Sequence, residues 1–339
     1  MIARIKLFTK TKNRISGFLK RRPHRSFRLT RRRDFKRELK LPGYFSFTGY
    51  VLKTLKKNWK LFLSLAFLSA IVTALLVGIA SQDSYQTISD TLDTTTEGFF
   101  SGGWGQIGKA SLLFLSSITG SFSSSLTELQ QALSVIIILF TWLISVWLLR
   151  NLLAGHKVKL RDGLYSAGSP VVATAIVALM LLVQMLPFAL AIIAYSAASA
   201  TGLLESGVEA MLFWISAGLL TLLSIYWITS TIFALIIITL PGVYPFKAIK
   251  LSGDLVIGRR LRIMLRLIWM IVSTLLVWAV ILIPIIIFDS WIKGVWSSIS
   301  WVPIVPVTVL ILSTLSVIWA SSYIYLLYRR IVADDAEKA

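Results

Sequence analysis

Along most of this chain, long uncharged runs alternate with short segments rich in lysine, arginine or acidic residues. The first run, LFLSLAFLSAIVTALLVGIA at residues 61–80, follows a collar of lysines and contains no charge. About twenty helical residues cover about 30 Å, which is the thickness of the hydrocarbon core of a bilayer. The same criterion predicts six transmembrane helices, at about 61–80, 131–149, 170–196, 210–240, 267–288 and 304–327.

Two of these predicted spans are irregular. The third contains Pro187, which has no backbone N–H to donate and should kink the helix. The fourth, at 210–240, is longer than one crossing needs, because a helix of this length covers about 45 Å. Two short crossings would place the basic residues that follow Pro241 on the outer side, against the usual charge asymmetry. We therefore predict one tilted or kinked helix.

The segments that join the spans differ in charge on the two sides. On one side, residues 44–60 mix aromatic rings with lysines and predict an interfacial helix, residues 156–170 form a basic loop, and residues 243–266 form a basic amphipathic segment. On the other side, residues 81–129 form an acidic loop, whose apolar run at 110–122 predicts an interfacial or packed helix. The spacing of its acids lacks the pattern of a calcium loop, so a solvated loop is favoured over a calcium site. The alternation of basic segments, spans and outer loops predicts three similar helical hairpins.

Composition agrees with this pattern and sets its orientation. Hydrophobic residues make up 56% of the 339 residues and the mean hydropathy is +0.77, yet 35 Lys and Arg stand against 15 acids. Basic residues favour the cytoplasmic side of a membrane. Lys109 and Lys293 are the two basic residues in the predicted outer loops. We therefore expect a multi-pass protein of the cell membrane with both termini in the cytoplasm.

Residues 1–43 predict a basic cytoplasmic tail that ends at Pro42-Gly43. The tail contains RRPHR and RRR and lacks the apolar core of a secretory signal peptide. We favour a solvated tail that enforces topology. Two alternatives stay open. The tail lies on anionic lipid, or it contacts nucleic acid or the ribosome, which is less favoured because no recognised binding module accompanies the charge.

Little in the sequence points to catalysis. Cysteine is absent, and His24 and His156 are the two histidines. No P-loop or HExxH motif occurs, and no charged residue lies well inside a predicted span. We therefore expect no enzyme activity, no catalytic residue, no metal site and no cofactor. Polar side chains within the spans usually pack helices or bond to backbone. The candidates for this role are Gln184, Thr229, Ser230, Thr231 and Ser313.

The stretch PGVYPFKAIKLSGDLVIGRRLRIMLRLIWM, residues 241–270, places a proline-containing helix end before an amphipathic stretch, a glycine and basic residues, and then a span. This arrangement resembles a group of bacterial six-helix membrane proteins that includes the membrane domain of some glycerophosphodiester phosphodiesterases. The residues that carry the resemblance are Pro241, Tyr244, Pro245, Ala248, Gly258, Arg259 and Arg260. It implies the six-helix architecture. It implies no phosphodiesterase activity, because no catalytic domain accompanies these spans.

These observations predict an all-α integral membrane protein with six transmembrane helices and basic amphipathic cytoplasmic connections. A basic tail (1–43) precedes the six-helix domain (44–331), and a short cytoplasmic tail (332–339) follows it. We expect a non-catalytic structural or accessory role in which the basic cytoplasmic face contacts membrane lipids, anionic ones above all. A membrane-protein partner is the second interaction that we consider. The alternative is a transporter or permease subunit with a polar path between kinked helices. The basic residues expected to face lipid are Arg31, Arg32, Arg33, Lys53, Lys56, Lys57, Lys60, Arg259, Arg260 and Arg262.

Overall fold

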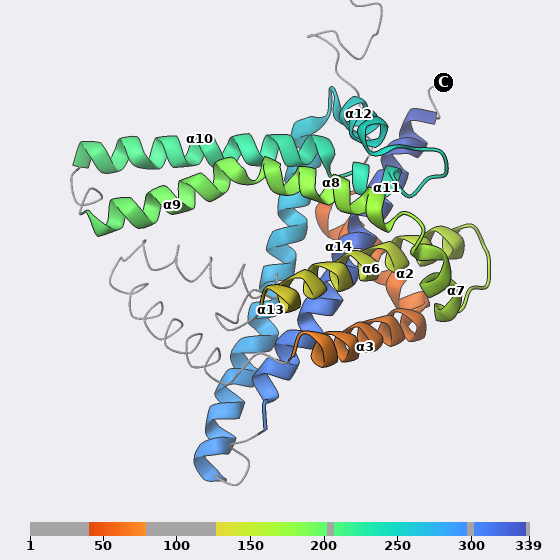
Figure 1. Cartoon of the computed structure of the whole chain (residues 1–339), viewed down its shortest axis with the longest axis horizontal. Coiled ribbons are helices and arrows are strands. Elements are labelled where there is room, and N and C mark those ends of the chain that lie inside the picture. Colours follow the sequence, from red (N-terminus) through yellow and green to blue (C-terminus); the bar gives the residue numbers. More distant parts are fainter. Residues whose placement is uncertain (1–40, 79–126, 202–206, 297–301, 337–339) are drawn as a thin grey trace, which may run out of the picture.

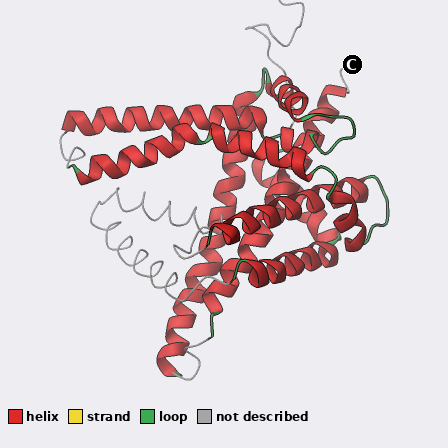
Figure 2. Cartoon of the chain, viewed as in Figure 1, coloured by secondary structure: helices red, strands yellow, loops and turns green. Residues whose placement is uncertain are grey.

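The computed structural model describes residues 41–78, 127–201, 207–296 and 302–336, and the regular structure within these ranges is entirely α-helical (Figures 1 and 2). Most of the predicted basic tail and most of the acidic loop lie outside the described residues. The alternatives for the tail, the helix expected at 110–122 and the calcium alternative therefore stay predictions.

The described helices confirm a polytopic helical membrane protein. Five helices, or helix pairs in line, are long and apolar enough to cross a membrane: α3 (Trp59–Leu76), α6 (Glu128–Leu153), α10 with α11 (Gly207–Thr231 and Ala234–Ile237), α13 (Arg260–Val295) and α14 (Ile304–Ala336). The count rises to six if a bent pair of helices in the region of the third predicted span is taken as one crossing. There, α7 (Leu160–Ala167) and α8 (Val171–Gln184) pass the same criteria as a pair bent by 75°, and the shorter apolar helix α9 (Leu186–Ala200) follows.

The predicted break near Pro187 is present. Helix α8 ends at Gln184 and α9 begins at Leu186, so the interruption falls at Met185. The next N–H after the proline, that of Phe188, donates to the Ser224 hydroxyl of α10 at 3.0 Å. A side chain from a neighbouring helix thus binds a backbone group at the break, which is how interrupted helices are tolerated in membranes.

The long fourth run forms one candidate span, Gly207–Ile237, as expected. Its helical order is interrupted between Thr231 and Ala234, so α11 is a short continuation of α10. The chain then turns at Pro241-Gly242, where Gly242 has a φ of 74°. This left-handed conformation strains any residue with a Cβ, which explains the glycine at this turn.

The connecting segments contain more helix than the sequence pattern indicated. The helix predicted over residues 44–60 is present as α2 (Tyr44–Lys57), and the amphipathic segment at 243–266 also forms a helix, α12 (Pro245–Val256). The predicted basic loop at 156–170 was an incomplete description, because it holds α7. In the same way α14 continues to Ala336, so the start of the expected C-terminal tail is helical. Lys, Arg and Glu are good helix formers. A hydropathy criterion therefore misses helical turns that are made of charged residues.

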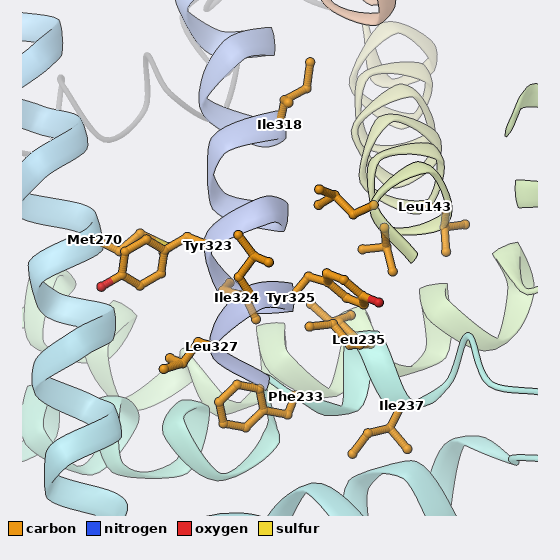
Figure 3. Packing of buried hydrophobic residues seen from close by; sticks show 14 of the residues in the cluster. Leu143, Phe233, Leu235, Ile237, Met270, Ile318, Tyr323, Ile324, Tyr325 and Leu327 are labelled. Carbon is orange, nitrogen blue, oxygen red and sulfur yellow. The ribbon is translucent and has the colours of Figure 1, made fainter. Parts of the chain in front are cut away.

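Consecutive spans pack against each other, α3 with α6, α8 and α9 with α10, and α13 with α14. Helix α14 also packs against α2, α3 and α6, which places it at the centre (Figure 1). The main core surrounds its second half, where Ser321 to Leu327 are buried. Figure 3 shows Leu143 of α6, Phe233 at the start of α11, Leu235 within α11, and Met270 of α13 around this part of α14.

The core lies at one end of the bundle, which we call the basic end. It is formed by α2, α7, α11, α12, the first turns of α3, α8 and α13, the last turns of α6 and the second half of α14. The opposite helix ends form the far end. Between 11% and 39% of the residues in the most apolar window of each long helix are buried, so most of the apolar surface faces outward. In Figure 1 the far ends of α9 and α10 point away from that of α13.

Candidate lipid-binding face at the basic end

The lysines predicted to face lipid are exposed on adjoining turns of α2 and α3. Within the described residues, none of them forms an ion pair with an acid. Three other segments bring further exposed basic side chains to the same end. The exposed set is Lys53, Lys56, Lys57, Lys60, Lys157, Lys159, Arg161, Lys247, Lys250, Arg262, Arg329 and Arg330. Arg31, Arg32 and Arg33 lie outside the described residues.

Helix α2 shows how the sequence produces this face. Phe47 and Val51, one helical turn apart, are fully buried, and the Phe47 ring packs edge-on against Tyr323 of α14 at 4.9 Å between ring centroids. Lys53, Lys56 and Lys57 lie outside this buried stripe and are exposed. An amphipathic helix with apolar residues on one side and lysines on another suits the boundary between hydrocarbon and head groups.

Arg259 does not belong to the exposed set, and its predicted role as a lipid-facing residue is corrected. Its side chain is buried and forms an ion pair with Asp335 near the end of α14. Its Nε donates to the Leu255 carbonyl oxygen at 3.0 Å. A buried guanidinium needs a carboxylate and carbonyl partners, because an unpaired charge is costly to remove from water. Arg259 therefore joins α12, α13 and α14.

Arg266 is a second buried arginine, and it was not among the predicted residues. Its guanidinium donates to the carbonyl oxygens of Pro42 and Gly43, to the latter at 3.3 Å. It also lies 4.2 Å from the centroid of the Tyr44 ring. Arg266 thus fixes the start of α2 against α13. Arginine suits this position because its planar fork reaches two acceptors and stacks on aromatic rings.

A signal for these buried arginines was present in the sequence. Arg259, Ile263, Arg266 and Met270 are spaced by four, three and four residues, which places them on one face of a helix. The structure buries all four, whereas Arg262 is exposed. Helical periodicity through the basic segment would have separated the two kinds of arginine.

Two more arginines at the basic end join different hairpins. Arg150, at the end of α6, donates to both the carbonyl and the hydroxyl oxygen of Thr239, the former at 3.0 Å. The half-buried Arg260 lies 3.9 Å from the centroid of the Tyr226 ring on α10. Arginines therefore bind the hairpins together, and the lysines of this end remain at the surface.

The polar residues within the spans act as helix-packing and backbone-bonding groups, as predicted. Gln184 of α8 donates to the Thr231 hydroxyl of α10 at 2.8 Å. The Ser230 carbonyl accepts a bond of 2.7 Å from Ser252 of α12. Thr229 and Ser313 donate to carbonyl oxygens of their own helices.

Among the described residues, no group of three or more His, Cys, Asp or Glu side chains is placed to hold a metal ion. Comparisons with protein-family models, with curated proteins and with solved structures give no match. The resemblance of residues 241–270 to the six-helix group therefore stays a prediction.

Proposed function

We propose that this chain is a non-catalytic integral membrane protein, structural or accessory in role, whose basic end contacts anionic lipid on the cytoplasmic side of the cell membrane. One observation carries the proposal. Exposed lysines and arginines from segments far apart in the sequence meet at one end of an otherwise apolar helical bundle.

Electrostatics supports this role. Each Lys or Arg held near an anionic leaflet contributes about 1 kcal/mol, over a distance limited by screening to about 8–10 Å. The acids of this end are partly committed elsewhere, since Asp335 pairs with Arg259 and the Asp162 carboxylate accepts a 3.0 Å bond from the Lys159 backbone N–H. The surface charge of the basic end is therefore strongly positive.

The alternative of a permease subunit finds no comparable support. It requires a polar path that reaches Gln184 between the kinked helices. The amide nitrogen of Gln184 instead donates to the Thr231 hydroxyl across the contact of α8 with α10. The side chain is 9% exposed, and its amide oxygen is buried with no hydrogen-bond partner among the described residues. This arrangement favours a packing role for Gln184.

Lipid retained during purification tests the proposal. The protein is extracted from bacterial membranes in mild detergent, and its phosphatidylglycerol, cardiolipin and phosphatidylethanolamine are quantified by mass spectrometry. We expect anionic lipid to be enriched over the bulk membrane. Replacing Lys53, Lys56, Lys57 and Lys60 together with Gln should lower this enrichment, and replacing the same four with Arg should preserve it. Equal enrichment in all three proteins would count against the proposal.

A further inference from the structure

A groove of about 430 Å³ lies between α2 and α3 on one side and α13 and α14 on the other. Its volume falls in the range of about 300–1,000 Å³ that is common for small-molecule sites. On α13 the lining runs from Ser273 to Ile281, a length of about 12 Å along the helix. The groove is thus elongated along the spans.

The wall of the groove is apolar in effect, although four hydroxyl-bearing residues line it. Thr48 donates to the Tyr44 carbonyl, Ser273 and Thr274 donate to the Met270 carbonyl, and Ser316 donates to the Leu312 carbonyl, all at 2.8–3.0 Å. The Thr48 and Ser316 oxygens also accept bonds from the indole N–H groups of Trp269 and Trp278. Hydroxyls whose protons are bonded to the backbone leave little capacity to bind a polar ligand.

One lining residue is charged, and it marks one part of the groove as different from the rest. Lys56, near the end of α2, is exposed and lines the groove together with Trp59 and Leu63. Lys53, Lys57 and Lys60 lie on the adjoining turns. Tryptophan and lysine are the side chains that mark head-group depth in membrane proteins. The groove therefore combines an elongated apolar wall with a cationic border.

We infer that this groove holds one acyl chain of an anionic phospholipid, whose phosphate lies against Lys56. The hydrocarbon of the chain matches the apolar wall, and the phosphate matches the charge at the border. The inference rests on the proposed function and deepens it, because it assigns a defined site to a lipid that the basic end would otherwise hold by diffuse attraction.

Photocrosslinking in nanodiscs tests the site with two probes. One is phosphatidylglycerol with a diazirine in its acyl chain, and the other is the matching phosphatidylcholine. After illumination, labelled peptides are mapped by mass spectrometry. We expect the phosphatidylglycerol probe to label the groove residues Leu63, Val277 and Leu315 above other exposed apolar positions. Val277→Trp, which fills the groove, should remove most of this labelling. Val280→Trp, on the same helix outside the lining and 72% exposed, should not.

The head-group contact has its own matched pair. Lys56→Gln should lower labelling by phosphatidylglycerol about fivefold and leave labelling by phosphatidylcholine unchanged, while Lys53→Gln, one turn away and outside the lining, should preserve both. Three results would overturn the site: labelling spread evenly over exposed apolar residues, equal yields for the two tryptophan variants, or groove residues crosslinked to a second copy of the chain in place of lipid. Equal labelling by both probes would overturn the anionic occupant.

These outcomes are separable from failure of the proposed function. Loss of groove labelling with anionic lipid still enriched on purification would reject the groove and leave the proposed function standing. Equal labelling of the groove by both probes, without such enrichment on purification, would reject the contact of the basic end with anionic lipid and leave the groove as a site for an acyl chain alone.

Discussion

The basic end and the far end of this bundle are built from similarly apolar helices, yet they differ sharply in packing. At the basic end, one core joins α2, α3, α6, α7, α8, α11, α12, α13 and α14. Toward the far end, a small cluster of Trp278, Leu282 and Leu312 joins α13 and α14, and side chains such as Ile283 and Ile287 are exposed. Apolar residues therefore do not by themselves decide where membrane helices associate, because lipid tails solvate them equally well.

The contacts of charged side chains follow the same division. Arg150, Arg259 and Arg266 each bridge separate segments at the basic end. The Asp289–Lys293 pair, near the end of α13, lies within a single helix at 2.8 Å. Contacts between segments hold helices together and contacts within one helix do not, so we expect substitutions at the two ends to differ in their effect on stability.

The largest effect is expected at Phe47. Phe47→Ala empties a fully buried position against Tyr323 and should lower the free energy of unfolding by about 3–5 kcal/mol. SDS titration of the protein in mixed micelles measures this change. Phe67→Ala on α3, where the ring is 67% exposed, is the control and should have little effect. Similar losses for the two variants would remove the distinction between core and lipid-facing aromatics.

The next effect concerns the buried arginine. Arg266→Gln removes the fork that binds the start of α2 and should cost about 1.5–3 kcal/mol, the range for hydrogen bonds to charged groups. Arg266→Lys should recover little of the lost free energy of unfolding, because an ammonium neither spans two carbonyls in one plane nor stacks on Tyr44 as a guanidinium does. Arg262→Gln, on the same helix and exposed, serves as the control in the same titration. If Arg262→Gln lowers the free energy of unfolding as much as Arg266→Gln does, the role of Arg266 in fixing the start of α2 is contradicted.

Much of this architecture could be predicted from the sequence, for identifiable reasons. Uncharged length located the long helices, and Pro187 and Pro241 located two interruptions. The helix at 160–167 and the continuation of α14 to Ala336 were missed, because hydropathy does not register polar helical turns. Helical periodicity separates the buried Arg259 and Arg266 from the exposed Arg262, but the partner of Arg259, Asp335, lies 76 positions away along the chain and no local pattern identifies it.

A third effect tests the docking of α7 on α6. A Cβ added at Gly163 would lie 3.3 Å from side-chain atoms of both Ile144 and Leu148. Gly163→Leu should therefore lower the free energy of unfolding by about 1–3 kcal/mol through overpacking. A Cβ added at Gly253 in α12 has no neighbouring atom within 4 Å, so Gly253→Leu should be neutral or slightly stabilising, since glycine is a poor helix former. A thermal-shift assay in detergent compares the pair, and a larger loss at Gly253 would argue against this packing.

The smallest effect belongs to the far end. Ile287→Ala removes a side chain that is 63% exposed and should change the free energy of unfolding by less than about 0.5 kcal/mol. SDS titration in mixed micelles, as for Phe47→Ala, measures this change. A loss comparable to that of Phe47→Ala would show that another surface packs against this helix, and it would direct attention to a partner protein at the far end.

Orientation in the membrane tests the central claim most directly, since the basic end must face the cytoplasm to meet its anionic leaflet. The chain has no cysteine, so single cysteines can replace Lys250 at the basic end and Val208 at the far end, both exposed. A membrane-impermeant maleimide added to intact cells should label the cysteine at 208, and it should label that at 250 after permeabilisation alone. Labelling of position 250 in intact cells, with position 208 protected, would contradict the account.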